Sequence, residues 1–210
     1  MRNPLKIVVV GASGKMGQTL IKQILADSDL LLIGAVDQPS CSVLGMDAGS
    51  LIGIKTGVMI DDDFESVIKK GDFVIDFTRP EASIAYLQTC IKNNVKYILG
   101  TTGFSDDEKE KISQAAKDIS ICFAPNMSVG VNLLVSLVED ATKVLHEDFD
   151  MEIIESHHSE KIDAPSGTAI RLGEAIAKTA NLNLKQNGVF HREGNIGRRK
   201  KNEIGFSTIR

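Results

Sequence analysis

The densest group of side chains able to do chemistry lies between Glu155 and Ala169. Two adjacent histidines, His157 and His158, and Lys161 fall within five residues of one another. Histidine titrates near neutral pH, and a lysine can donate a proton when its surroundings favour the neutral amine. The segment therefore predicts a proton-transfer site.

A helix start follows directly. An amphipathic pattern that runs to about Ala180 follows Pro165, Ser166, Gly167 and Thr168. Ser166 is the expected N-cap of this helix. The free N–H groups and positive end of a helix suit a carboxylate. We therefore predict that an anionic substrate binds here, with cationic proton donors beside it.

Two alternatives are open for this segment. Adjacent histidines can belong to a metal site, but no H-E-x-x-H motif or third close ligand accompanies His157 and His158, so no metal is predicted. The segment could also be a solvated polar loop ahead of an ordinary helix. The basic run from Arg198 to Lys201 is more typical of a solvated turn than of a binding patch.

A glycine-rich loop near the N-terminus predicts a second site. The run Gly11-Ala12-Ser13-Gly14-Lys15-Met16-Gly17 follows a β-branched apolar segment and opens a helical pattern. Small residues let the backbone approach a pyrophosphate, and the helix N-terminus faces its charge. The spacing is G-x-x-G-x-x-G. A Walker A loop is excluded, because Met16 stands where Ser or Thr is required.

Asp37 supports the interpretation of the glycine-rich loop as the pyrophosphate-binding turn of a dinucleotide site. It ends the second predicted strand about 20 residues after the loop, where an acidic residue binds the adenosine ribose hydroxyls. An Asp here favours NADH, and Gln38 follows it where an NADPH enzyme would carry Arg. Lys15 could still reach a 2′-phosphate, so we predict that NADH serves at least as well as NADPH.

Two further strand ends are expected to reach the nicotinamide. They are Gly100-Thr101-Thr102-Gly103 and Ala124-Pro125-Asn126-Met127. Each follows a predicted strand, and ligands bind at the carboxyl ends of parallel strands.

The elements that must position these residues alternate in type. Strands are expected at 7–10, 30–36, 73–77, 97–99, 119–124, 151–155 and 204–210, and helices include 106–117, 131–145 and 167–180. The pattern predicts an α/β fold: a Rossmann-type parallel sheet domain at 1–127, then an α+β substrate and oligomerisation domain at 128–210. Because the last strand ends the chain without a capping element, the second domain is expected to be incomplete.

Composition limits the partners. Lys and Arg number 24 against 28 Asp and Glu, giving a net charge of −4, so no overall positive field favours nucleic acid or an anionic membrane. No run approaches the roughly 20 apolar residues of a membrane span. The three separated cysteines are typical of reduced thiols, so we expect a cytoplasmic protein.

The chain resembles the 4-hydroxy-tetrahydrodipicolinate reductase (dihydrodipicolinate reductase) family of bacterial lysine biosynthesis. The resemblance covers nearly the whole chain and rests on GASGKMG, DFTRPE, GTTGF, APNMSVGVN and the final GFSTIR. The most specific match is ESHHSEKIDAPSGTA, which starts at Glu155.

The resemblance implies NAD(P)H-dependent reduction of a cyclic dicarboxylate to tetrahydrodipicolinate. It makes His157 and Lys161 the catalytic pair, with His158, Gly167 and Thr168 holding the substrate carboxylates. The implied cofactor residues are Gly11, Ala12, Ser13, Gly14, Lys15, Met16, Asp37, Gln38, Gly100, Thr101, Thr102, Ala124, Pro125, Asn126 and Met127. It also implies a homotetramer and a chain that continues beyond residue 210.

Two other functions are open on the sequence. One is a related oxidoreductase acting on another small carboxylate or sugar acid, against which the H-H-x-x-K segment argues. The other is a non-catalytic NAD(P)-binding fragment, which would bind cofactor without turnover.

Overall fold

The chain folds into two compact units. The computed structural model describes residues 3–210, and the first unit ends at Pro125 while the second begins at Asn126.

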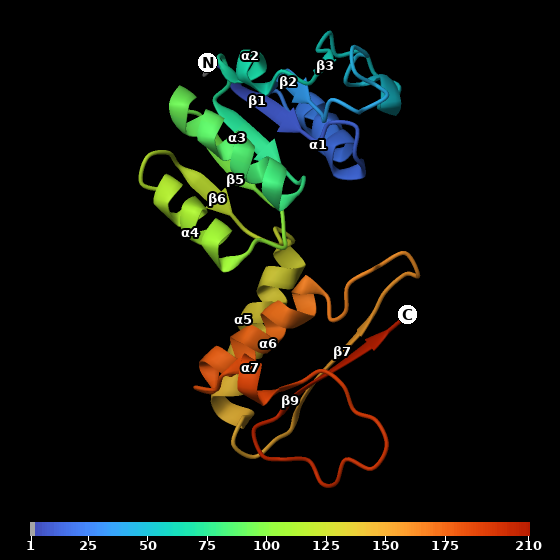
Figure 1. Cartoon of the computed structure of the whole chain (residues 1–210), viewed down its shortest axis with the longest axis vertical. Helices are drawn as coiled ribbons and strands as arrows, with labels where there is room; N and C mark the ends of the chain where they lie inside the picture. Colours follow the sequence, from blue (N-terminus) through green and yellow to red (C-terminus); the bar gives the residue numbers. More distant parts are fainter. Residues whose placement is uncertain (1–2) are drawn as a thin grey trace. The chain divides into compact units, whose positions relative to one another are not determined.

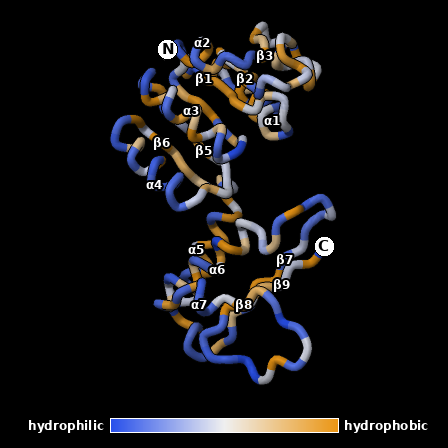
Figure 2. Tube along the Cα trace, viewed as in Figure 1, coloured by the Kyte–Doolittle hydropathy of each residue, from blue (hydrophilic) through white to orange (hydrophobic). Residues whose placement is uncertain are grey.

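The first unit is built on a six-stranded parallel sheet with the order β3-β2-β1-β4-β5-β6 (Figure 1). Its strands are β1 (Leu5–Val10), β2 (Leu30–Val36), β3 (Ile60–Asp61), β4 (Phe73–Asp76), β5 (Lys96–Leu99) and β6 (Ile121–Phe123). Figure 2 shows the inner strands as hydrophobic, which is expected where a parallel sheet is covered on both faces. The order is that of a Rossmann domain, so the predicted fold class is confirmed.

Helices pack on both faces of this sheet. They are α1 (Lys15–Ala26), η1 (Ser50–Ile52), α2 (Phe64–Ile68), α3 (Pro80–Asn93) and α4 (Asp106–Ala115). Alternate β1 residues enter different cores: Val8 and Val10 join the residues of α2, α3 and α4, whereas Ile7 and Val9 join those of α1. The period of two along a strand explains this division.

Local signals set where these helices begin. Pro80 occupies the first turn of α3, and Ser105 caps α4 through a reciprocal capping box with Glu108. The strand β3 and the helix α2 were not predicted, because elements this short carry too little periodicity to detect.

The strand order places a topological switch point between β1 and β4. From β1 the chain proceeds through β2 to β3 on one side, whereas β4, β5 and β6 extend on the other. The loops that leave the carboxyl ends of β1 and β4 diverge there, which opens a crevice for ligands.

The second unit packs two long helices on a small sheet. It contains α5 (Val129–Leu145), β7 (Met151–Ser156), α6 (Gly167–Thr179), α7 (Leu184–Asn187), β8 (Gly188–Val189) and β9 (Ile204–Ile209). The sheet has the order β7-β9-β8, and both strand pairs are parallel. The strand predicted at 204–210 is therefore the central one, and a Cβ on Gly173 of α6 would lie 2.4 Å from the Phe206 ring of β9.

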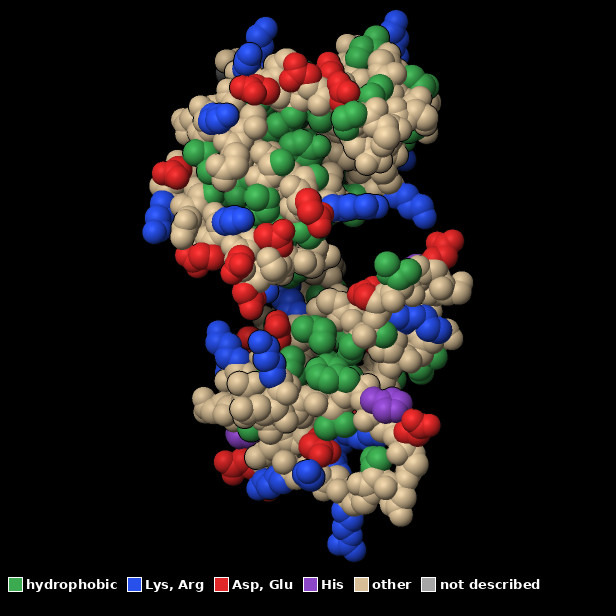
Figure 3. All heavy atoms as spheres, in the orientation of Figure 1, with side chains coloured by type: hydrophobic (Ala, Val, Ile, Leu, Met, Phe, Trp, Pro, Cys, Tyr) green, Lys and Arg blue, Asp and Glu red, His purple; other side chains and the backbone are tan. Residues whose placement is uncertain are grey.

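The surface has mixed charge. On the face drawn in Figure 3, basic and acidic side chains are interspersed over the first unit. Within residues 3–210, no helix combines the length and the apolar character that crossing a membrane requires.

Candidate functional site

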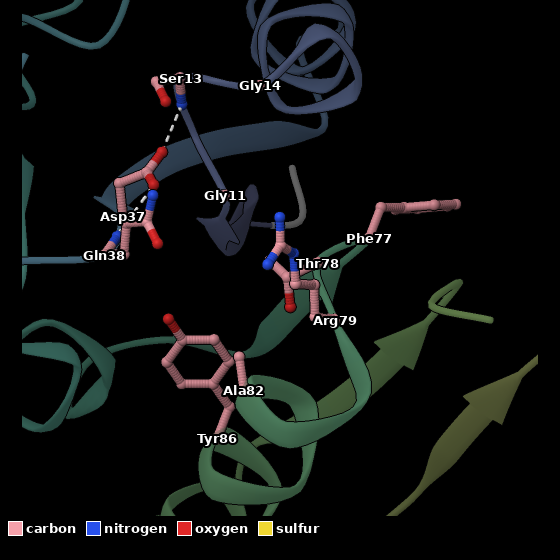
Figure 4. A pocket seen from close by; sticks show the side chains of 10 residues that line it. All are labelled: Gly11, Ser13, Gly14, Asp37, Gln38, Phe77, Thr78, Arg79, Ala82 and Tyr86. Carbon is pink, nitrogen blue, oxygen red and sulfur yellow. Dashed lines mark hydrogen bonds between the residues drawn. The ribbon is translucent and has the colours of Figure 1, made fainter. Parts of the chain in front are cut away.

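A cavity lies at the switch point of the first unit. Its volume is about 310 Å³, and it is lined by Gly11, Ser13, Gly14, Asp37, Gln38, Phe77, Thr78, Arg79, Ala82 and Tyr86. In Figure 4, Asp37 and Gln38 face the side chains of Arg79 and Tyr86 across this space. The structure thus brings together the glycine loop and the acidic strand end that the sequence singled out.

The glycine loop is shaped to accept a phosphate group. Gly11 has a φ of +69°, and a Cβ at this position would lie 2.8 Å from the Thr78 methyl group. Gly14 is the N-cap of α1 and has no side chain with which to occupy the free N–H groups of the first turn. These groups suit a pyrophosphate, so the loop fits a dinucleotide.

Gly17 keeps this loop close to α1, and its replacement by alanine is expected to distort the loop. A Cβ there would lie 2.2 Å from the Gly11 carbonyl oxygen and 2.8 Å from the Ala12 Cα. Both neighbours are backbone atoms, so the loop itself must shift. We expect a loss of about 1–3 kcal/mol in the free energy of unfolding and weaker NADH binding, measured by urea denaturation and by titration.

Gly130→Ala provides the matched control, because a Cβ in that helix would meet nothing nearer than 3.8 Å. Stability and NADH affinity that remain at wild-type values in Gly17→Ala would show that the loop is not held this tightly.

Asp37 is bound to the glycine loop. Its Oδ2 accepts a hydrogen bond from the Ser13 N–H at 2.8 Å, and its Oδ1 accepts one from the Gln38 N–H at 2.9 Å. The half-buried carboxylate therefore orients the loop and still lines the cavity. Gln38 and Lys15 are both exposed.

The cavity residues that follow β4 were not predicted as site residues from the sequence. Phe77, Thr78 and Arg79 come from the D-F-T-R-P-E run, and Tyr86 lies about two turns further along the chain, in α3. Arg79 is exposed and adds a cation to the same cavity as Asp37. In a Rossmann strand order β1 and β4 are neighbours, so the loop that follows β4 lies beside the glycine loop. That order was the signal that could have identified the D-F-T-R-P-E run as part of the cavity.

Asp76 anchors the Gly100–Thr102 segment through a hydrogen bond inside the protein. This fully buried carboxylate accepts hydrogen bonds from the Thr78 N–H at 2.7 Å and from the Thr101 hydroxyl at 3.2 Å. The Tyr97 hydroxyl also donates to it, and burial together with the Asp76 charge raises the pKa of Tyr97. The Thr101 hydroxyl is therefore engaged inside the protein, whereas Thr102 is exposed.

Asn126 links two predicted sites within the second unit. Its side-chain amide donates to the Thr168 hydroxyl at 3.3 Å. Its carbonyl oxygen accepts from Asn132 Nδ2 at 3.2 Å and from Arg171 Nη1 at 3.4 Å. Asn126, which is predicted to contact the cofactor, is thus hydrogen-bonded to the first turn of α6. Of its neighbours, Ala124 is half-buried and Pro125 and Met127 are exposed.

The predicted catalytic side chains are each paired with an acid. Lys161 Nζ lies 2.6 Å from Asp163 Oδ1, and His157 Nε2 lies 2.8 Å from Glu155 Oε2. The hydrogen bond from Lys161 lowers the pKa of Asp163. No side-chain hydrogen bond joins His157 to Lys161 within residues 3–210, although the two side chains are only 25% and 21% exposed.

The start of α6 is built as the sequence predicts. Ser166 is the N-cap, and its hydroxyl accepts from the Ala169 N–H at 3.1 Å. Gly167 and His158 are exposed, Thr168 is half-buried, and a Cβ on Gly167 would meet open space. A carboxylate can therefore approach this helix end. Among the described residues, no group of three or more His, Cys, Asp or Glu side chains is placed to hold a metal ion.

Comparisons with known proteins agree across both units. The family model described as dihydrodipicolinate reductase, N-terminus, matches residues 5–127, and the model for its C-terminus matches residues 130–210. The 4-hydroxy-tetrahydrodipicolinate reductase of Nitrosomonas europaea is 50% identical over 99% of this chain. The enzyme of that name from Neisseria meningitidis is 47% identical over 99%. The chain spans 77% of the length of each relative.

A solved structure shows the same fold. The dipicolinate-bound dihydrodipicolinate reductase from Paenisporosarcina sp. TG-14 matches with a TM-score of 0.72 and 25% identity, covering 98% of this chain and 78% of that one. Together with the two family models, these likenesses show that the chain belongs to the dihydrodipicolinate reductase family.

Proposed function

We propose that this chain reduces 4-hydroxy-tetrahydrodipicolinate to tetrahydrodipicolinate with NADH or NADPH, in diaminopimelate and lysine biosynthesis. Membership of a family of NAD(P)H-dependent oxidoreductases supports the reaction class. The observation that carries the proposal is the accessible start of α6, with Lys161 and His157 in the segment just before it. Such a site suits an anionic substrate that must receive a proton.

Cofactor binding belongs to the glycine loop and to the strand ends. The proposed residues are Gly11, Ala12, Ser13, Gly14, Lys15, Met16, Asp37, Gln38, Gly100, Thr101, Thr102, Ala124, Pro125, Asn126 and Met127. The bound nicotinamide supplies the hydride. The loop N–H groups hold the pyrophosphate, and Asp37 accepts from the ribose hydroxyls. Because the Thr101 hydroxyl is engaged by Asp76, Thr101 acts through its backbone.

Substrate binding and proton transfer belong to the segment before α6 and to its first turn. His158, Gly167 and Thr168 hold the two carboxylates. Addition of hydride increases the negative charge of a dicarboxylate, so nearby cations and a proton donor lower the barrier. Lys161 donates that proton, and His157 serves as a proton relay or as electrostatic support. Water is the leaving group.

The proposal includes the organisation of the chain. Residues 1–127 form the dinucleotide-binding domain and 128–210 the substrate-binding domain, which the ranges of the two family models support. The partner is a small dicarboxylate, and the active form is a homotetramer in the cytoplasm. The exposed apolar side chains of α5, among them Val129, Leu133 and Leu137, support oligomerisation.

The test follows the absorbance of NADH and of NADPH with purified protein and freshly generated 4-hydroxy-tetrahydrodipicolinate. Oxidation that depends on the substrate is the expected result. Oxidation with a different small carboxylate alone would reassign the substrate. Binding of NADH without turnover on any carboxylate would favour a non-catalytic cofactor-binding protein.

A further inference from the structure

Glu155 is the most highly connected side chain near the proposed catalytic residues. Its Oε1 accepts from the Ser166 N–H at 2.7 Å and from the Thr208 hydroxyl at 2.9 Å. Its Oε2 accepts from the Ser166 hydroxyl and contacts His157 Nε2 at 2.8 Å. The side chain is only 12% exposed. One carboxylate thus joins the end of β7, the central strand β9, the cap of α6 and the imidazole.

The ionisation of Glu155 decides which nitrogen of His157 carries hydrogen. Burial raises the pKa of Glu155, but the hydrogen bonds from Ser166, His157 and Thr208 outweigh it and lower that pKa to about 2. An ionised carboxylate can only accept hydrogen bonds. His157 Nε2 must therefore be the donor, and in the neutral ring Nδ1 is left with a free lone pair.

We propose that Glu155 is a positioning residue that holds the His157 ring with Nε2–H turned inward, so that Nδ1 is the nitrogen presented to the substrate. The inference rests on the proposed function for the role of His157. Because Glu155 also binds the backbone and hydroxyl of Ser166, the same carboxylate sets the ring against the start of α6, where the substrate carboxylates are proposed to bind. An orienting carboxylate behind a catalytic imidazole selects its tautomer in this way.

A purely structural role for Glu155 makes different predictions. In Glu155→Gln the amide oxygen can still accept from Ser166 N–H and Thr208, whereas the amide NH₂ would face His157 and the Ser166 hydroxyl. A donor now meets Nε2, so the neutral ring is expected to move its proton to Nδ1. If Glu155 only braces the loop and the tautomer of His157 plays no part in the reaction, kcat stays at its wild-type value in this isosteric replacement.

The experiment combines NMR with kinetics. The ¹⁵N shifts of the His157 ring are measured at a pH where the imidazole is neutral, and the chain's four histidines allow assignment by loss of the signal in His157→Gln. We expect Nε2–H in the wild type and Nδ1–H in Glu155→Gln. We also expect kcat to fall about 10- to 100-fold, while the affinity for NADH stays at its wild-type value.

Thr208→Val is the matched control. It removes one hydrogen bond from Glu155 but keeps the charge that faces His157, so the tautomer and kcat should stay close to wild type. A loss of kcat in Thr208→Val equal to that in Glu155→Gln, or a wild-type kcat in Glu155→Gln, would overturn the proposal.

The wild-type spectrum keeps the proposal testable if Glu155→Gln does not fold. Nδ1–H in the neutral wild-type ring would overturn it, and Nε2–H would support it. The ring shifts do not depend on turnover. Failure of the proposed reaction therefore appears in the absorbance assay, whereas failure of this inference appears in the spectrum.

Discussion

Replacement of Lys161 by alanine is expected to lower turnover by about 100-fold or more, the contribution of a positioned proton donor. Lys161 precedes the α6 start, and its ion pair with Asp163 at 2.6 Å fixes its ammonium group. The affinity for NADH should stay near wild type, because Lys161 lies outside the glycine loop. Steady-state kinetics and fluorescence titration with NADH measure the two quantities separately.

Two further variants sharpen this test. Lys161→Arg keeps the positive charge but cannot release a proton in the protein, so it should be nearly as slow as the alanine variant if Lys161 is the donor. Retained turnover in Lys161→Arg would instead assign an electrostatic role. Lys178→Ala, in the last turn of α6, is the control and should behave as wild type. Wild-type turnover in Lys161→Ala would end the assignment.

Replacement of Asp37 by alanine is expected to weaken NADH binding by about 10- to 100-fold. Hydrogen bonds to a charged group contribute about 1.5–3 kcal/mol, and about 1.4 kcal/mol corresponds to a tenfold change in affinity. The variant loses the ribose contacts and also the hydrogen bond that orients Ser13. NADPH binding should fall less, because the carboxylate repels a 2′-phosphate. The measured ratio of the two affinities therefore shifts toward NADPH.

Asp37→Asn separates the two losses. Its amide oxygen can still accept from the Ser13 N–H, so the loop stays oriented while the charge is removed. We expect an NADH affinity between those of wild type and Asp37→Ala. Unchanged NADH affinity in both variants would remove Asp37 from the ribose site.

Features that depend on residues close together along the chain could be predicted from the sequence. The β1 strand, the glycine turn that follows it, the Pro80 helix start and the Ser166 cap were all predictable. Each depends on side-chain period, on backbone freedom or on a hydrogen bond reaching a few residues along the chain. The parallel sheet followed from the alternation of strand and helix, and the family motifs implied the proposed roles of individual residues.

Which distant residues lie next to one another became known only from the folded chain. The pairing of β1 with β4 brings Thr78 and Arg79 into the cavity beside Gly11. Burial of Asp76 turns the Thr101 hydroxyl inward, although the sequence shows only a polar residue at a strand end. The pairing of β7 with β9 brings Thr208 to Glu155. These neighbours lie 25 to 68 positions apart in the sequence. No local period encodes them, because they depend on the order of the strands in the sheet and on how closely the elements pack.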